Sequence, residues 1–251
     1  MKDFILNNKY KIFIIIVLVS IWFLFATYIS NEIKIPSPIR VIEELIVIVL
    51  DKNFLLNLVS TCKRVIFSFL LSFTLGIVLG MISGFYGFIR DLLEPIILVL
   101  KSMPTMAVIL LALIWLGRES SPILVCFLVC FPIIYSTVVS GIINIDKKLL
   151  EMVNIYRFTK MKKLFHLYLP SIVASLAAIL PTGFSLTFKV CIAAEVLSQP
   201  KYAMGTGFQM ERVALNTAGV LAWAIITIIL SGVFETIISK ILKISFISNK
   251  Q

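Results

Sequence analysis

Long runs without a charged side chain constrain this sequence more than any other feature. A helix needs about 20 mostly apolar residues to cross the hydrocarbon core of a bilayer, and five charge-free runs reach that length. They do not alternate polar and apolar residues as barrel strands do. The runs are residues 12–31, 65–89, 120–145, 167–188 and 213–234, and a sixth stretch, 95–117, carries only Lys101. The sequence predicts an all-α, polytopic membrane bundle of about six transmembrane helices.

Composition agrees with this fold class. The chain is 60% hydrophobic and 14% charged, whereas a soluble domain is about half apolar and a quarter charged. The first run follows three lysines like a secretory signal, but it is longer than a signal core and lacks a clear cleavage site. We expect it to be retained as a helix.

The basic residues predict the orientation. If both termini are cytoplasmic, 13 Lys and Arg residues lie on the inner side and 8 on the outer side, which satisfies the positive-inside rule. Contacts with anionic lipid at the cytoplasmic face then account for the net charge of +10. No nucleic-acid partner is needed to explain it.

Two segments outside the cytoplasmic loops carry recognisable helix signals. Ser37-Pro38 is typical of a helix start, and the apolar residues that follow predict a stripe of Val41, Leu45, Ile46 and Val49. In the span predicted for residues 60–84, the glycines at four-residue spacing predict close helix packing. These glycines are Gly76, Gly80 and Gly84.

Prolines and lysines interrupt the middle spans, predicted at residues 92–116, 121–143 and 171–196. Pro104, Pro132 and Pro181 each free a backbone carbonyl, which indicates either bends around a cavity or ordinary kinks. Lys189 lies deep in its span, which leaves two interpretations. Either it lines a solute pathway and favours anions there, or its side chain snorkels to the interface or pairs with Glu195 or a neighbouring helix. Lys101 is nearer a helix end, and we expect it to snorkel.

The segment 144–170 is the one sizeable polar stretch on the predicted cytoplasmic side. Asp146 is placed to cap a helix from Lys147. Its apolar side chains are expected on one face, and a second short helix is expected to end at Leu169-Pro170. That face comprises Leu149, Leu150, Val153 and Tyr156. From the residues alone the segment is either a lipid-surface helix or a docking element for a cytoplasmic partner.

This segment resembles the cytoplasmic loop of type I ABC importer permeases, which has the form E-A-A-x3-G-x9-I-x-L-P. Glu151 and Leu169-Pro170 match that spacing without a gap. Further similar pieces follow in chain order over residues 55–241, and the set is most similar to the nitrate, sulfonate and taurine branch. They are Ser60-Thr61, Arg64, Gly76, Gly80, Met103-Pro104, residues 114–117, residues 143–146, Ala194-Glu195, Gly205 and Gly207.

One departure from the motif is severe. Met152 and Val153 replace its alanines, which is mild, but Arg157 replaces the glycine at the bend between the two short helices. Either Arg157 adopts a left-handed conformation at a cost of about 1 kcal/mol, or the bend changes.

The resemblance implies a division of labour. A second permease copy would complete the pathway, cytoplasmic ABC ATPase subunits would drive it, and an extracellular binding protein would deliver a small solute. The resemblance implies either an anion or a thiamine precursor as that solute. The chain has no G-x4-G-K-[ST] loop, so ATP hydrolysis is assigned to the partner and the chain is not expected to be an enzyme. With one histidine, His166, and no CxxC pair, neither a metal site nor a cofactor is expected.

The predicted site residues fall into two sets. The coupling set is Glu151, Met152, Val153, Tyr156, Arg157, Phe158, Leu169 and Pro170, and the pathway set is Lys189, Glu195, Pro104 and Pro132.

We expect three regions: residues 1–53 with the first span and an external segment, a permease core over 54–241, and a cytoplasmic tail over 242–251. Alternatives are a transporter driven by an ion gradient, although no internal symmetry is evident, a membrane enzyme and a non-transporting scaffold.

Overall fold

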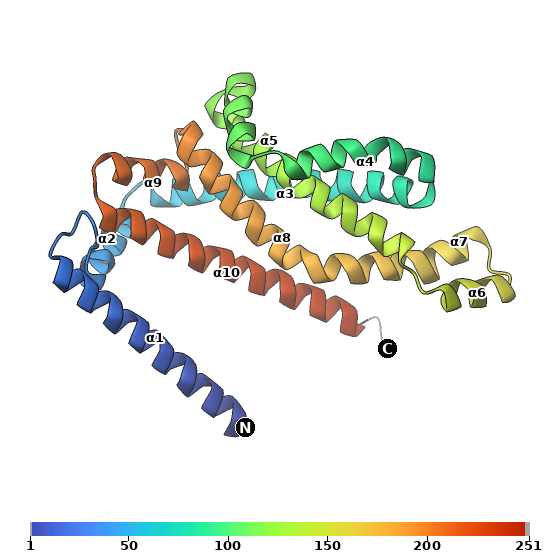
Figure 1. The fold of residues 1–251 in the computed structure, drawn as a ribbon, viewed down its shortest axis with the longest axis horizontal. Coiled ribbons are helices and arrows are strands. Elements are labelled where there is room, and N and C mark those ends of the chain that lie inside the picture. The colour runs from blue at the N-terminus through green and yellow to red at the C-terminus, as the bar shows by residue number, and fades with distance from the viewer. Residues whose placement is uncertain (1, 249–251) are drawn as a thin grey trace.

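Helices build nearly all of the described chain in this computed structural model, which covers residues 2–248 and the side chains of Tyr10 and residues 13–242 (Figure 1). The elements are α1 (Lys2–Ile29), α2 (Pro38–Leu50), α3 (Phe54–Phe85), α4 (Gly87–Ser102), α5 (Thr105–Ile143), α6 (Lys147–Ile155), α7 (Lys160–Lys163), the π-helical turn η1 (Leu164–Tyr168), α8 (Leu169–Ser198), α9 (Met204–Val213) and α10 (Thr217–Ser248). The fold is therefore a polytopic helical membrane bundle, as predicted.

Among the described residues, four helices are long and apolar enough to cross a bilayer: Phe54–Phe85, Thr105–Ile143, Lys160–Ser198 and Thr217–Leu242. The apolar part Phe13–Ile29 belongs to the 28-residue helix α1, which corresponds to the predicted first span. The helix α9, which precedes α10, was not predicted from the sequence.

The predicted third span, residues 92–116, is wrong as a single helix. α4 ends at Ser102, Met103 and Pro104 have extended backbones, and α5 begins at Thr105. Proline disfavours the helical conformation of the residue before it and offers no N–H, so the chain breaks at this pair. A second break follows inside α5, where Gly117 has φ 70°. The part of α5 before Gly117 changes direction from the rest of the helix (Figure 1), and its Val108, Ile109 and Ala112 are buried against Val125 and Ala194.

The glycine stripe of α3 packs against α5, as predicted. A Cβ placed on Gly76 would lie 2.7 Å from Ile134 Cγ2, and one on Gly80 would lie 2.8 Å from Val138 Cβ. One on Gly84 would collide with Ile142. The small residues let the two backbones approach closely, and that contact holds the centre of the bundle.

The helix predicted from Ser37-Pro38 is α2. The Ser37 hydroxyl accepts a hydrogen bond from Arg40 N at 3.3 Å, and Pro38 occupies the first turn. Val41 and Ile48 are buried, but Ile46 and Val49 are exposed, so the predicted stripe was wrong for these two positions. The buried face of α2 packs on α10.

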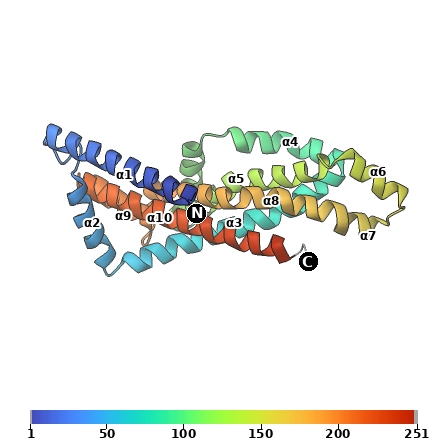
Figure 2. The same ribbon diagram turned by 90° about the horizontal axis from the view of Figure 1, so that it is seen from below.

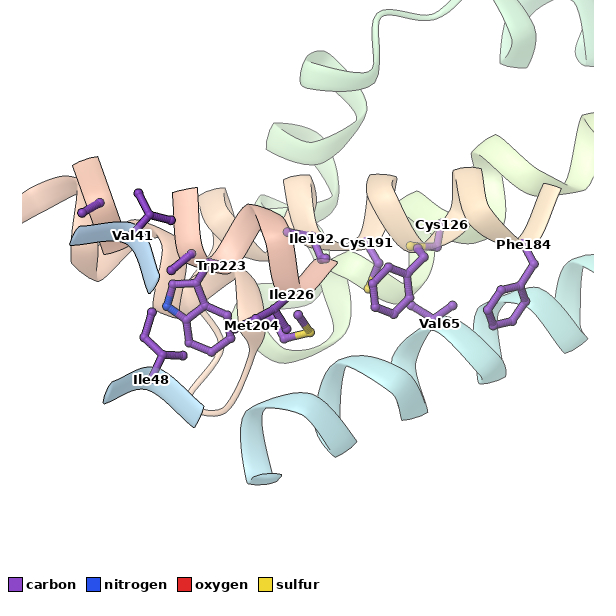
Figure 3. Packing of buried hydrophobic residues seen from close by; sticks show 13 residues of the cluster. Val41, Ile48, Val65, Cys126, Phe184, Cys191, Ile192, Met204, Trp223 and Ile226 are labelled. Carbon is purple, nitrogen blue, oxygen red and sulfur yellow. The ribbon is translucent and has the colours of Figure 1, made fainter. Parts of the chain in front are cut away.

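The main apolar core joins α2, α3, α5, α8, α9 and α10 (Figure 3). Phe188 and Cys191 of α8 are fully buried between Val65 of α3 and Cys126 of α5. The cysteines are free thiols that act as small apolar packers, as expected. At one end of the long axis lie α2 and α9, and at the other lie α6 and α7 (Figures 1 and 2).

Candidate functional site

The loop between α5 and α8 begins with the predicted capped helix. The Asp146 carboxylate accepts a hydrogen bond from Lys148 N at 2.9 Å, which satisfies one of the free N–H groups of the first turn. The helix that follows, α6, runs from Lys147 to Ile155. The Asp146 cap predicted from the sequence is confirmed.

Arg157 has the left-handed backbone that the family glycine would provide, with φ 49°. Its N–H donates to Asn154 O at 3.0 Å, and Phe158 N–H donates to Val153 O at 3.1 Å. These two bonds form a Schellman motif, which satisfies the last carbonyls of α6. The bend of the loop is thus kept without glycine, at a cost of about 1 kcal/mol.

A small apolar cluster holds the loop against the start of α8. Val153 is 3% exposed and packs with Ile145 and Leu167, and Phe158 lies against them. Leu149 and Tyr156, predicted on the same face as Val153, are instead 44% and 71% exposed. That prediction was wrong because the first and last turns of this short helix extend beyond the cluster.

The helix predicted to end at Leu169-Pro170 does not end there. The chain continues from α7 through η1 into α8, and Leu169 N–H donates to Leu164 O across five residues. Because proline at position 170 has no N–H and its ring crowds the preceding turn, the wider π turn lets the helix pass. The loop is therefore joined to α8 by continuous helical backbone.

The outer face of the loop is exposed and largely apolar. Met152 is 43% exposed, Ile155 78% and Tyr156 71%, and the Glu151 carboxylate is exposed beside them. Among the described side chains, Glu151 has no ion-pair partner. This face, comprising Leu149, Glu151, Met152, Ile155 and Tyr156, is called the loop face below.

At the opposite end of the bundle, Glu195 of α8 is fully buried and hydrogen-bonded to residues of α3 and α9. Its carboxylate accepts from Thr61 Oγ1 at 2.8 Å, Arg64 Nη1 at 3.1 Å and Gly205 N at 3.2 Å. A buried carboxylate with this many donors is satisfied in place. The suggested pairing with Lys189 was wrong, since the partner is Arg64.

Arg64 extends this network to α5. Its Nη2 donates to Glu119 Oε2 at 2.7 Å, its Nη1 donates to Tyr202 O at 2.9 Å, and Glu119 Oε1 accepts from Lys201 N at 2.8 Å. Residues of the family resemblance that are far apart in the chain therefore meet in one site. Glu119 was missed, although its position two residues after the Gly117 break was a usable signal.

The other predicted pathway residues lie apart from this network. Pro104 is exposed at the break before α5, and Pro132 is buried within α5. Lys189 is exposed on α8. Lys101, expected to snorkel, lines a groove between α5 and α8.

Comparisons with known proteins agree with this architecture. Residues 76–242 match the family described as binding-protein-dependent transport system inner membrane component. A putative ABC transporter permease of Methanocaldococcus jannaschii is 30% identical over 193 residues, 74% of this chain and 72% of that protein.

Two relatives have names that state a solute. The taurine transport system permease of Escherichia coli is 24% identical over 228 residues, 87% of this chain and 82% of its own. The nitrate import permease of a Synechocystis strain is 26% identical over 175 residues, 65% of this chain and 63% of its own.

Proposed function

The chain belongs to the family of binding-protein-dependent transport inner membrane components, and from that premise we propose that it forms the translocation path of an ATP-driven importer for a small anionic solute. A second copy of the chain completes the path. Cytoplasmic ATPase subunits drive it, and an extracellular binding protein delivers the solute. The names of the taurine, nitrate and sulfonate relatives support the anionic class.

The loop face is the observation that carries this proposal. Its four large apolar side chains are exposed, as is a carboxylate without an ion-pair partner among the described side chains, although the underside of the same short helix is firmly packed. An exposed apolar patch with a polar rim is typical of a protein interface. We assign it to the ATPase subunit, where Glu151 pairs with a basic group and Met152, Tyr156 and Arg157 add contacts.

The connection to α8 supports a coupling role. Val153 and Phe158 fix the loop to Leu167, and η1 passes into α8 through Leu169-Pro170. A displacement of the loop by closing ATPase subunits is therefore transmitted to a helix that spans the membrane. In the proposed cycle, ATP binding turns the path outward and hydrolysis returns it inward.

The orientation that this role requires has both termini in the cytoplasm. The Lys and Arg counts support it. The pathway set Lys189, Glu195, Pro104 and Pro132 remains a proposal within this scheme, as does the division into regions 1–53, 54–241 and 242–251.

Purification of the chain from its native membranes tests the function. We expect an ATPase subunit to co-purify, and Glu151→Ala to reduce both its recovery and the solute-stimulated ATP hydrolysis. Glu32→Ala, which removes an exposed carboxylate before α2, is the matched control and should change neither. Uptake that persists in ATP-depleted cells would instead favour a transporter driven by an ion gradient.

A further inference from the structure

A groove of about 450 Å³ opens between α5 and α8, and Lys101 of α4 forms part of its wall. Most of its other lining side chains carry hydroxyl or amide groups. Within the described lining, Lys101 is the one charged side chain. The polar members are Lys101, Ser136, Thr137, Ser140, Asn144, Ser171 and Ser175, and we call this set the Lys101 groove.

The polar residues form two facing rows. Ser136, Ser140 and Asn144 follow one another at four-residue spacing along α5, so they share a helix face. Ser171 and Ser175 do the same on α8. The two helices are held together at this point, since Ser171 Oγ donates to Gly141 O at 2.7 Å. The rows therefore form a fixed polar surface.

An adjoining hollow of about 330 Å³ lies between α4 and α5 and shares Lys101, Ser136 and Ser140 with the groove. Tyr135 also lines it, is 4% exposed, and its hydroxyl has no hydrogen-bond partner among the described residues. A buried hydroxyl without a partner loses free energy of about 1–3 kcal/mol. The position thus has an unused hydrogen-bonding group beside the lysine. Arg90 and Glu94 line the far part of this hollow.

Lys101 lies in the last turn of α4, where its exposed side chain lines both hollows. Charged side chains of membrane proteins face water-filled cavities or partners rather than acyl chains. Among the described side chains, Lys101 has no ion-pair partner. The polar lining of the groove is therefore the protein surface that the ammonium group faces.

We propose that the Lys101 groove binds the anionic group of the transported solute. The ammonium group supplies three donors and a positive charge, and serine hydroxyls supply further donors to an oxyanion that has no proton to give. No carboxylate lines the groove within the described residues, so an anion meets no repulsion there. The chemical class is a small oxyanion such as a nitrate or an alkyl sulfonate. This assignment rests on the proposed importer function and gives it a solute-binding position.

Thiol labelling of the full-length chain in membranes tests the groove without any partner. Ser140→Cys places a thiol in it, and the rates of reaction with an anionic and a cationic methanethiosulfonate reagent are compared. We expect the anionic reagent to be favoured, and the ratio to fall roughly three- to tenfold when Lys101→Gln is added. Lys240→Gln, an exposed lysine on α10, should leave the ratio unchanged. The native chain gives the background from its own thiols.

Protection experiments test binding itself. Nitrate and ethanesulfonate should slow the labelling of Ser140→Cys, whereas the neutral solute ethylene glycol should not, and Lys101→Gln should abolish the protection. Absence of labelling, a ratio unaffected by Lys101→Gln, or absence of protection would each overturn the proposal. A groove that binds these anions in a chain that recruits no ATPase would instead overturn the importer function and leave the site standing.

Discussion

Arg64 Nη1 lies 3.1 Å from Glu195 Oε1, although the two residues are 131 positions apart in the chain. The carboxylate is fully buried, and the arginine side chain is 11% exposed. Through Thr61, Glu119 and Gly205 the pair connects α3, α5, α8 and α9. These helices are thus tied at one end of the bundle by a single ionic network, and α5 and α8 are joined at the other end by the loop that contains α6 and α7.

Arg64→Ala should destabilise the chain strongly. It leaves the Glu195 carboxylate buried without its charge partner, and removal of one member of a buried pair costs about 3–5 kcal/mol. Glu195→Gln should cost less, because the amide can still accept from Thr61 and Arg64 keeps Glu119 and Tyr202 O. Thermal unfolding of the detergent-purified variants, followed by size-exclusion chromatography, measures both changes.

Arg40→Ala is the control for this experiment, since Arg40 pairs with Glu43 and Glu44 on the surface of α2. Exposed ion pairs contribute little, so its unfolding temperature should stay near that of the native chain. If Arg64→Ala lowered the unfolding temperature no more than Arg40→Ala does, the buried network would not hold the helices together.

The sequence predicted features that depend on local chemistry or on the membrane. Charge-free runs predicted the membrane fold, Ser37 and Asp146 predicted helix starts, and the α3 glycines predicted a close contact between helices. Each follows from a physical rule that acts within one helix or on its burial in lipid. The bend at Arg157 was predictable from the loop resemblance, and the structure shows that the left-handed alternative holds.

Features that depend on distant neighbours were not predictable. The break at Met103-Pro104 was hidden because proline is tolerated inside membrane helices when neighbours satisfy the backbone. The continuous helix through Pro170 was not predicted, because a π-helical turn before Pro170 removes the clash between the proline ring and the preceding turn. The partner of Glu195 and the position of Lys101 depend on which helices meet, and hydropathy carries no information about that.

Gly80→Ala should loosen the contact between α3 and α5. The new methyl group would lie 2.8 Å from Val138 Cβ and 3.1 Å from Tyr135 O, so the backbones must separate. Overpacking of this kind costs about 1–3 kcal/mol. Gly232→Ala, which meets nothing within 4 Å, is the matched control and should not lower the unfolding temperature. Equal unfolding temperatures for the two variants would contradict the close contact.

Arg157→Gly should stabilise the end of α6. Glycine adopts φ 49° without the steric cost of about 1 kcal/mol that arginine has. Hydrogen–deuterium exchange of residues 147–170 should therefore slow by up to about fivefold, and Arg157→Val should accelerate it, because a β-branched residue tolerates this conformation poorly. Faster exchange in Arg157→Gly would show that the arginine side chain, rather than the backbone, holds the bend.

Lys189→Gln should lower uptake of an anionic solute without unfolding the chain. Ser171, Ser175, Thr182 and Lys189 are separated by four, seven and seven residues, so they share the face of α8 that continues the Lys101 groove. A positive charge on that face favours the approach of anions. Uptake of radiolabelled ethanesulfonate into cells, corrected for the amount of folded chain, provides the measurement, and Lys240→Gln controls for the loss of a charge elsewhere. Normal uptake by a folded Lys189→Gln variant would exclude Lys189 from the pathway and leave Lys101 as the intramembrane cation available to the solute.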